Sequence, residues 1–316
     1  MMHTQDWTSL PGMFKAAGFK SFGSGKTYHD TVQNGWKDAL FEYDGLRSWS
    51  WESLPYRNPC WTQGIDCSGC PKGPGSSIKD RWNIGNVTED WCVSESGDLS
   101  DVFTTDHAIG LLHKAVKHSK AKTPFYLAVG YHKPHLPWIA KQKHFDMYPL
   151  ESIKLAEHLT LDRSRPEIAF HDCDSPSPYE PLTELQAKLA RRAYYAATTA
   201  MDEEIGRILD ALDASGVADN TAIVLHSDHG WALGEHGQWR KNSNWENSLR
   251  VPFIISVPWL PESHGTRTAA LAELIDIMPT MAELADIDVP HTKAGDLKNP
   301  IEGTSLVPAL KGDFGS

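Results

Sequence analysis

The sequence predicts an α/β protein in which a mostly parallel sheet is sandwiched between helices. Short apolar runs of the kind that form buried strands occupy residues 125–130, 221–226 and 251–257. Segments with helical spacing of apolar residues alternate with them, which is the pattern of strands joined by crossover helices. With 316 residues, of which 40% are hydrophobic, the chain is long enough for a sizeable core. We expect a single domain over residues 1–316.

Composition and charge exclude several classes of protein. Lys and Arg number 30 against 41 Asp and Glu, so the net charge of −11 disfavours a nucleic-acid-binding domain. No apolar run approaches the ~20 residues that a membrane span requires. The first residues, Met1 to Asp6, lack a basic stretch followed by an apolar one, so this chain shows no signal peptide.

The first elements are predicted to be a short helix and a strand. Ser9 can cap a helix that runs through Ala17, and Gly18 can end it. Residues 19–22 then form a strand that runs into the glycine-rich residues 23–26. An irregular segment follows over about 31–99, and loops of this length inside a domain are usually functional insertions.

Four of the five cysteines lie in this irregular segment, between Cys60 and Cys92. A loop held by one or two disulfides is the favoured interpretation, and free thiols are the alternative. Cys67 and Cys70 have the spacing of a redox or metal pair, but no strand leads into them. The sequon at Asn86 mildly supports a secretory route.

The middle of the chain alternates helix, strand and loop. Apolar residues spaced by three and four predict a helix from Thr105 to His118, before the strand at 125–130. A second irregular stretch fills about 136–180. Thr183 and Gln186 form a capping-box pattern at the start of the clearest helix, which Gly216 ends.

The last third continues the alternation. Strands are expected at 221–226 and 251–257. A helix is expected over 269–285, interrupted at Pro279.

Three polar clusters follow predicted strands, where open α/β sheets bind ligands. They are Lys26 with His29, the segment His132–His135, and Asp228–His229 continuing to Lys241. Together they form a cationic patch that suits a tetrahedral anion, phosphate or sulfate, beside one metal ion. Singly, each has a plain alternative as a turn, a loop or a surface charge, and neither a P-loop nor a His-Glu-x-x-His motif is matched.

These segments resemble the sulfatase family of the alkaline-phosphatase-like superfamily, and within it the iduronate-2-sulfatase subgroup. Residues 227–241 resemble the family's metal-and-lysine segment, 128–137 its histidine loop, and 22–29 its Gly-Lys-x-x-His segment. Residues 195–212 resemble its long helix and 302–306 a late motif, all in family order. The resemblance covers nearly the whole chain.

The resemblance implies a role for each matched position. Lys26, His29, His132 and Lys241 would be catalytic and contact the sulfate, whose oxygens gain charge as the S–O bond breaks. A histidine can protonate the leaving alcohol. Further substrate-binding residues would be Lys133, His135 and His236. Asp228 and His229 would bind one divalent cation, for which the family's usual ion is calcium.

Parts of the family pattern do not occur in these residues. The family nucleophile is a formylglycine made from Cys or Ser in Cys/Ser-x-Pro/Ala-x-Arg, and none of the five cysteines has Arg four residues on. The matched region also lacks the first strand, with its Asp-Asp metal pair, and the smaller C-terminal antiparallel subdomain. We therefore expect a partial catalytic domain with an exposed sheet edge and little turnover.

The expected partner is a sulfated sugar of the glycosaminoglycan type, and a full-length version is expected to be lysosomal or secreted. Two alternatives stay open. A phosphoesterase of the same superfamily would bind a similar tetrahedral anion. A non-catalytic binder of sulfated glycans would use the cationic residues without turnover.

Overall fold

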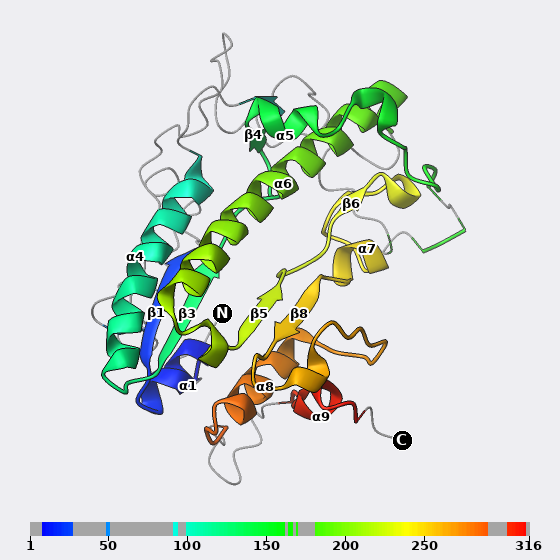
Figure 1. Ribbon diagram of the computed structural model, residues 1–316. Coiled ribbons are helices and arrows are strands. Elements are labelled where there is room, and N and C mark those ends of the chain that lie inside the picture. Colours follow the sequence, from blue (N-terminus) through cyan, green and yellow to red (C-terminus); the bar gives the residue numbers. More distant parts are fainter. Residues whose placement is uncertain are drawn as a thin grey trace, which may run out of the picture.

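The computed structural model describes residues 8–27, 49–50, 91–93, 99–161, 164–166, 169, 181–289 and 302–313. Figure 1 shows an α/β arrangement in which long helices α4 and α6 run beside short strands. The predicted fold class is confirmed, since helices pack on both faces of the first strand pair.

That pair consists of β1 (Lys20–Gly25) and β3 (Phe125–Gly130), which are parallel and in register from one end to the other. Helix α4 (Ser100–Lys120) covers one face, where Phe22 and Leu111 are buried together. Helix α1 (Leu10–Ala16) covers the other face, where the ring of Phe14 stacks on that of Tyr126 at 4.8 Å between centroids.

Local signals at the helix ends act as the sequence predicts. The Ser9 hydroxyl accepts a hydrogen bond from the amide of Gly12 at 3.1 Å, which caps α1. Helix α6 (Glu184–Ser215) begins with the Thr183–Gln186 capping box and ends at Gly216, whose φ of 75° is left-handed.

Other boundaries differ from the prediction. Helix α4 begins five residues before Thr105, with Ser100 and Asp101 at its start. The predicted helix over 269–285 is reduced to a 3-10 turn, η9 (Leu274–Asp276), and α8 (Ile277–Leu284). Pro279 does not interrupt α8: it occupies the first turn, where a backbone N–H has no intrahelical partner to lose.

The stretch predicted as irregular from 136 to 180 in fact contains short elements. These are β4 (Trp138–Ala140), α5 (Gln142–Asp146) and the 3-10 turn η4 (Leu150–Ser152). Strand β4 pairs in parallel with β2 (Trp91–Val93). Trp138 and Phe145 are buried against a row of alanines on α6, whose small side chains allow the close approach.

Most of the predicted segment 31–99 and residues 170–180 lie outside the described residues. The same holds for the sequon at Asn86 and for every cysteine except Cys92.

The second strand pair leads into the third polar cluster of the sequence, which runs from Asp228 to Lys241. Strand β5 (Ile223–His226) is antiparallel to β8 (Phe253–Ser256). The chain between them forms the β6–β7 hairpin (Ala232–Leu233 and Trp239–Arg240), with the 3-10 turn η7 (Glu235–Gly237) at its tip, and then α7 (Glu246–Leu249). The remaining short elements are η6 (Ala218–Asn220), η8 (Pro261–Ser263) and α9 (Val307–Leu310).

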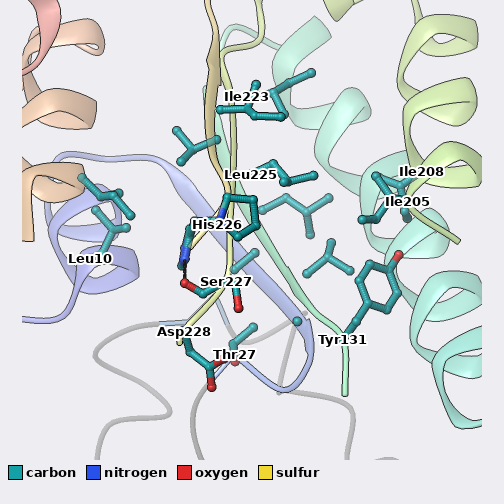
Figure 2. Close-up of a pocket in the computed structure, with 18 of the residues that line it drawn as sticks. Leu10, Thr27, Tyr131, Ile205, Ile208, Ile223, Leu225, His226, Ser227 and Asp228 are labelled. Carbon is teal, nitrogen blue, oxygen red and sulfur yellow. Dashed lines mark hydrogen bonds between the residues drawn. The ribbon is translucent and has the colours of Figure 1, made fainter. Parts of the chain in front are cut away.

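A large cavity separates the two strand pairs. Its volume is about 1930 Å³, and it is lined by β3, β5 and the apolar face of α6. Figure 2 shows Ile223 and Leu225 of β5 on one side of this space and Ile205 and Ile208 of α6 across from them. Within the described residues, β3 pairs only with β1 and β5 only with β8, so each has an edge toward the cavity.

A search of the helices in the described ranges finds none with the length and apolar character that a bilayer crossing requires.

Candidate functional site

Lys26 and His132 are brought together because they follow the ends of two paired parallel strands. Gly25 at the end of β1 lies opposite Gly130 at the end of β3, and the amide of Lys26 donates to the carbonyl of Gly130 at 2.7 Å. A Cβ atom on Gly130 would collide with the carbonyl group of Lys26. The glycine is therefore required for the contact that places both side chains at one mouth of the cavity.

The loop after β3 rests on the first turn of α4. The buried carboxylate of Asp101 accepts hydrogen bonds from the backbone amides of His132, at 3.1 Å, and Lys133, at 3.0 Å. The Nδ1 atom of His132 lies 3.9 Å from Asp101 Oδ1. Burial raises the pKa of the Asp101 carboxyl, while Lys133 and the two amides oppose that rise.

Lys133 and His135 line the cavity but also brace their own loop. The Lys133 ammonium donates to the carbonyl of Pro137 at 2.6 Å, and its burial lowers its pKa to about 8. His135 Nδ1 lies 2.8 Å from the carbonyl of Leu136, and burial lowers the pKa of the imidazole to about 4. At neutral pH His135 is therefore an uncharged ring, with Nδ1 donating to that carbonyl.

A hairpin brings Lys241 next to His229, the residue after Asp228. The pairing of β6 with β7 folds the chain back, so that the Lys241 ammonium donates to His229 Nε2 at 2.9 Å. His229 Nδ1 donates to the carbonyl of Gly230 at 2.8 Å, which fixes the neutral tautomer. Burial and the charge of Lys241 lower the pKa of this imidazole.

The two halves of the site meet at Asp228. Its carboxylate lies 3.6 Å from the Lys26 ammonium and 3.6 Å from His229 Nε2. Partial burial raises the pKa of this carboxyl, but the ammonium groups, Lys26 first and Lys241 with it, outweigh burial and hold the pKa below its ordinary value. Figure 2 shows Asp228 at the same end of the pocket as Thr27, the neighbour of Lys26.

The remaining predicted residues lie apart. His236 at the hairpin tip has a φ of 55°, and its ring stacks on Trp245 at 4.2 Å and on His158 at 5.7 Å between centroids. The contacts in the described chain place it in this stack, and it does not line the cavity. His29 lies outside the described residues.

Two residues that support the site, Asp101 and Arg191, are not predicted by the sequence. One is Asp101, whose only signal is an acidic residue in the first turn of a helix. The other is Arg191 on α6, which donates to the carbonyl of Leu233 at 2.8 Å and to the Glu235 carboxylate at 3.1 Å. Glu235 in turn accepts from the amide of Leu233 at 2.6 Å, so this ion pair holds the hairpin in place.

The described residues do not by themselves form a calcium site. Calcium takes about six to eight oxygen ligands, and no group of three or more His, Cys, Asp or Glu able to hold a metal occurs in the described ranges. Asp228 supplies one carboxylate, and His229 Nε2 already accepts from Lys241. The predicted calcium site is thus incomplete in this part of the chain.

Comparisons with known proteins show which family the chain resembles. The human iduronate 2-sulfatase is 32% identical over 325 residues, which cover 92% of this chain and 56% of that relative. A phosphonate monoester hydrolase from Silicibacter pomeroyi has a similar fold, with a TM-score of 0.68 and 21% identity over 99% of this chain and 63% of its own. A solved structure in complex with D-glucosamine-2-N,6-O-disulfate gives a TM-score of 0.59 at 21% identity, covering 98% of this chain and 65% of that one.

The chain thus spans about half the length of the curated relatives it matches. The family model described as Sulfatase matches residues 3–287, which is most of the sequence. This chain belongs to the sulfatase family.

Proposed function

We propose that this chain forms the sulfate-binding and leaving-group side of a sulfuric ester hydrolase that acts on sulfated sugars of the glycosaminoglycan type. The observation that carries the proposal is that Lys26, His132, Asp228 and His229 line a single cavity. Lys26 lies beside Asp228 there, and Lys241 reaches the same place through its contact with His229. Three separate loops supply these groups, and cationic groups fixed in this way suit the oxygens of a sulfate ester.

Each residue has a defined task in this proposal. Lys26 and Lys241 neutralise charge on the sulfate oxygens, and Lys133 adds positive charge from behind the loop. His132 holds a proton at its imidazole and transfers it to the ester oxygen as the S–O bond breaks, so that the sugar leaves as an alcohol. His29 and His135 would complete the wall around the substrate, and His236 would contact a more distant part of the sugar.

The nucleophilic step lies beyond these residues. Sulfatases use a formylglycine and a divalent cation. None of the five cysteines lies in the Cys-x-Pro/Ala-x-Arg pattern, and the one serine match, Ser53 to Arg57, lies outside the described residues. We propose Asp228 and His229 as ligands of the cation, which is calcium by family resemblance. Asp228 supplies the one carboxylate of this site within the described ranges, and one is too few for tight binding. We therefore expect no saturable calcium binding at micromolar concentration in calorimetry. Micromolar affinity would contradict the incomplete site.

The identity of the sugar is supported by the relatives alone. The matched iduronate 2-sulfatases and the neighbour holding a disulfated glucosamine both point to sulfated uronic-acid or hexosamine units. We propose a 2-sulfated uronic acid as the first substrate to test, and a lysosomal or secreted location for the whole protein.

Calorimetry with a 2-sulfated uronic-acid disaccharide tests the binding function. We expect the sulfated disaccharide to bind and the desulfated one to bind at least tenfold more weakly. Lys241→Met should weaken binding about tenfold. Lys188→Met should leave it unchanged, because Lys188 pairs with Glu184 on α6 away from the cavity. Equal affinity for the two disaccharides would sink the proposed function.

Measurement of sulfate and phosphate release separates the enzymatic alternatives. We expect little sulfate release from an aryl sulfate or the disaccharide, because none of the five cysteines lies in the family's nucleophile pattern. Robust release of sulfate would overturn the expected inactivity but support the sulfatase assignment. Preferential release of phosphate from a matched ester would favour the phosphoesterase alternative.

A further inference from the structure

Asp101 lies beneath the loop that carries His132 and is almost fully buried, with 4% of its surface exposed. Its two carboxylate oxygens accept from two consecutive backbone amides, those of His132 and Lys133, at 3.1 and 3.0 Å. A carboxylate that receives two N–H groups fixes the planes of both peptide units, and charge-assisted hydrogen bonds of this kind are stronger than neutral ones.

The loop needs such support because the strand ladder has ended. Pairing between β1 and β3 stops at Gly25 and Gly130, two residues before His132. Beyond that point the backbone of the loop is held from the side by α4 rather than by a neighbouring strand. The backbone amides of His132 and Lys133 are held there by Asp101.

Helix α4 is itself fixed against the strands and against α6. The Ser24 hydroxyl donates to the carbonyl of Thr104 at 2.9 Å, one turn after Asp101. The hydroxyls of Thr105 and Tyr131 lie 3.1 Å apart, and Tyr131 donates to the carbonyl of Glu204 on α6 at 3.3 Å. Asp101 is thus presented from a helix turn that is tied to two neighbouring elements.

Building on the sulfate-binding role proposed above, we propose that Asp101 is a positioning residue that holds the His132 imidazole in place for the substrate. It acts through the His132 and Lys133 backbone and through the 3.9 Å approach of its carboxylate to His132 Nδ1. Asp101 itself does not touch the substrate. Its carboxylate gives this loop the support that a neighbouring strand would give, so that His132 keeps a fixed position.

The substitution Asp101→Asn tests this role with little change in size. The amide keeps one acceptor oxygen but turns an NH2 group toward one of the two backbone amides, and the negative charge beside His132 is lost. Asp106→Asn is the matched control, because Asp106 lies on the same helix and pairs with Arg207 in a more exposed position. Both variants are made in the full chain.

Two readouts are measured: the NMR signals of the His132 ring and amide, and the affinity for inorganic sulfate. We expect Asp101→Asn to shift the His132 signals and weaken sulfate binding at least tenfold, while the ring signals of His113 on the outer face of α4 stay in place. Asp106→Asn should leave both readouts unchanged. The role is refuted if Asp101→Asn leaves the His132 signals and the sulfate affinity as they are.

The two proposals fail in distinguishable ways. If the unsubstituted chain does not bind sulfate, the proposed function fails, and the His132 signals alone decide the role of Asp101. If Asp101→Asn does not fold, hydrogen exchange in the unsubstituted chain replaces it. Protected amides at His132 and Lys133 support the role, and exchange at the rate of an open loop overturns it.

Discussion

The ammonium group of Lys26 lies 3.6 Å from a carboxylate oxygen of Asp228, although the two residues follow strands of different sheets. Lys26 comes directly after β1, and Asp228 comes two residues after β5. The pair bridges the mouth of the cavity between those sheets. It is the point where the two halves of the proposed sulfate site touch.

Removing the Lys26 ammonium should raise the pKa of Asp228 but have little effect on the free energy of unfolding. The Asp228 side chain is 63% exposed, so the ion pair adds little to the free energy of unfolding. Lys26 is, however, the first of the charges that hold the pKa of Asp228 below its ordinary value. We expect Lys26→Met to raise that pKa. The pKa is measured by NMR, from the chemical shift of the Asp228 carboxyl carbon as a function of pH. Lys188→Met should leave it in place, and an unmoved midpoint in Lys26→Met would show that the pair does not form.

The contact between the strand ends should be sensitive to a single methyl group. Gly130→Ala would place a Cβ atom against the Lys26 carbonyl group and force the two strand ends apart. We expect it to lower the free energy of unfolding by about 2–4 kcal/mol, measured by urea denaturation, and to weaken sulfate binding.

Gly110→Ala is the control for that substitution. Gly110 lies inside α4, and a Cβ atom there would meet nothing within 4 Å. Because alanine favours a helix over glycine, we expect Gly110→Ala to raise stability by about 0.5–1 kcal/mol. A destabilisation equal to that of Gly130→Ala would mean that the strand-end contact is not the cause.

His135 should make the stability of the chain depend on pH. Burial lowers its pKa to about 4, whereas an unfolded histidine titrates near 6.5. Below pH ~6.5 the unfolded chain therefore takes up a proton that the folded chain refuses, so this contribution is present at pH 7 and is lost as the pH falls toward 4. We expect a loss of about 3 kcal/mol from this group over that range.

Urea denaturation of His135→Gln at several pH values checks this expectation. The variant should lose less stability than the unsubstituted chain between pH 7 and 4. His113→Gln, on the exposed side of α4, should keep the original dependence. Identical pH dependence of His135→Gln and the unsubstituted chain would contradict the burial of this ring.

The apolar cavity should bind hydrophobic dyes. Strands β3 and β5 carry apolar residues of the buried-strand type, yet their side chains are only partly buried in the structure. We expect the chain to enhance the fluorescence of an anilinonaphthalene sulfonate dye and to self-associate with rising concentration in sedimentation.

Ile254→Lys should reduce both effects, because Ile254 lines the cavity and is 59% exposed. Leu271→Lys is the control, since Leu271 is 98% exposed but does not line the cavity. Equal dye binding by the two variants would place the dye elsewhere on the surface.

Residues whose place follows from a strand end could be predicted from the sequence. Lys26 and His132 follow apolar runs, and parallel strands end at one edge, so both could be placed at the ligand-binding edge of the sheet. The structure adds that their two strands are direct neighbours. The capping box at Thr183 and the stop at Gly216 are likewise local signals that the structure confirms. These positions depend on residues a few places away in the chain.

The supporting residues could not be predicted, because their partners are distant in the chain. Asp101 binds amides some 30 residues away, and it precedes the helix that the sequence predicts from Thr105. The backbone at His236 has a positive φ, which the pattern of apolar residues does not predict. Its ring stacks on that of Trp245. The hydrogen bond from the Lys133 ammonium to the carbonyl of Pro137 within its own loop likewise has no signal in the sequence.

Helix α6 touches both halves of the site without belonging to either. Its Arg191 grips the hairpin that carries Lys241, and its Glu204 carbonyl receives the hydroxyl of Tyr131 beside His132. The helix therefore sets the distance between the two halves of the site across the cavity. A bend between these two grips would alter the spacing of the groups around the anion while leaving every one of them intact.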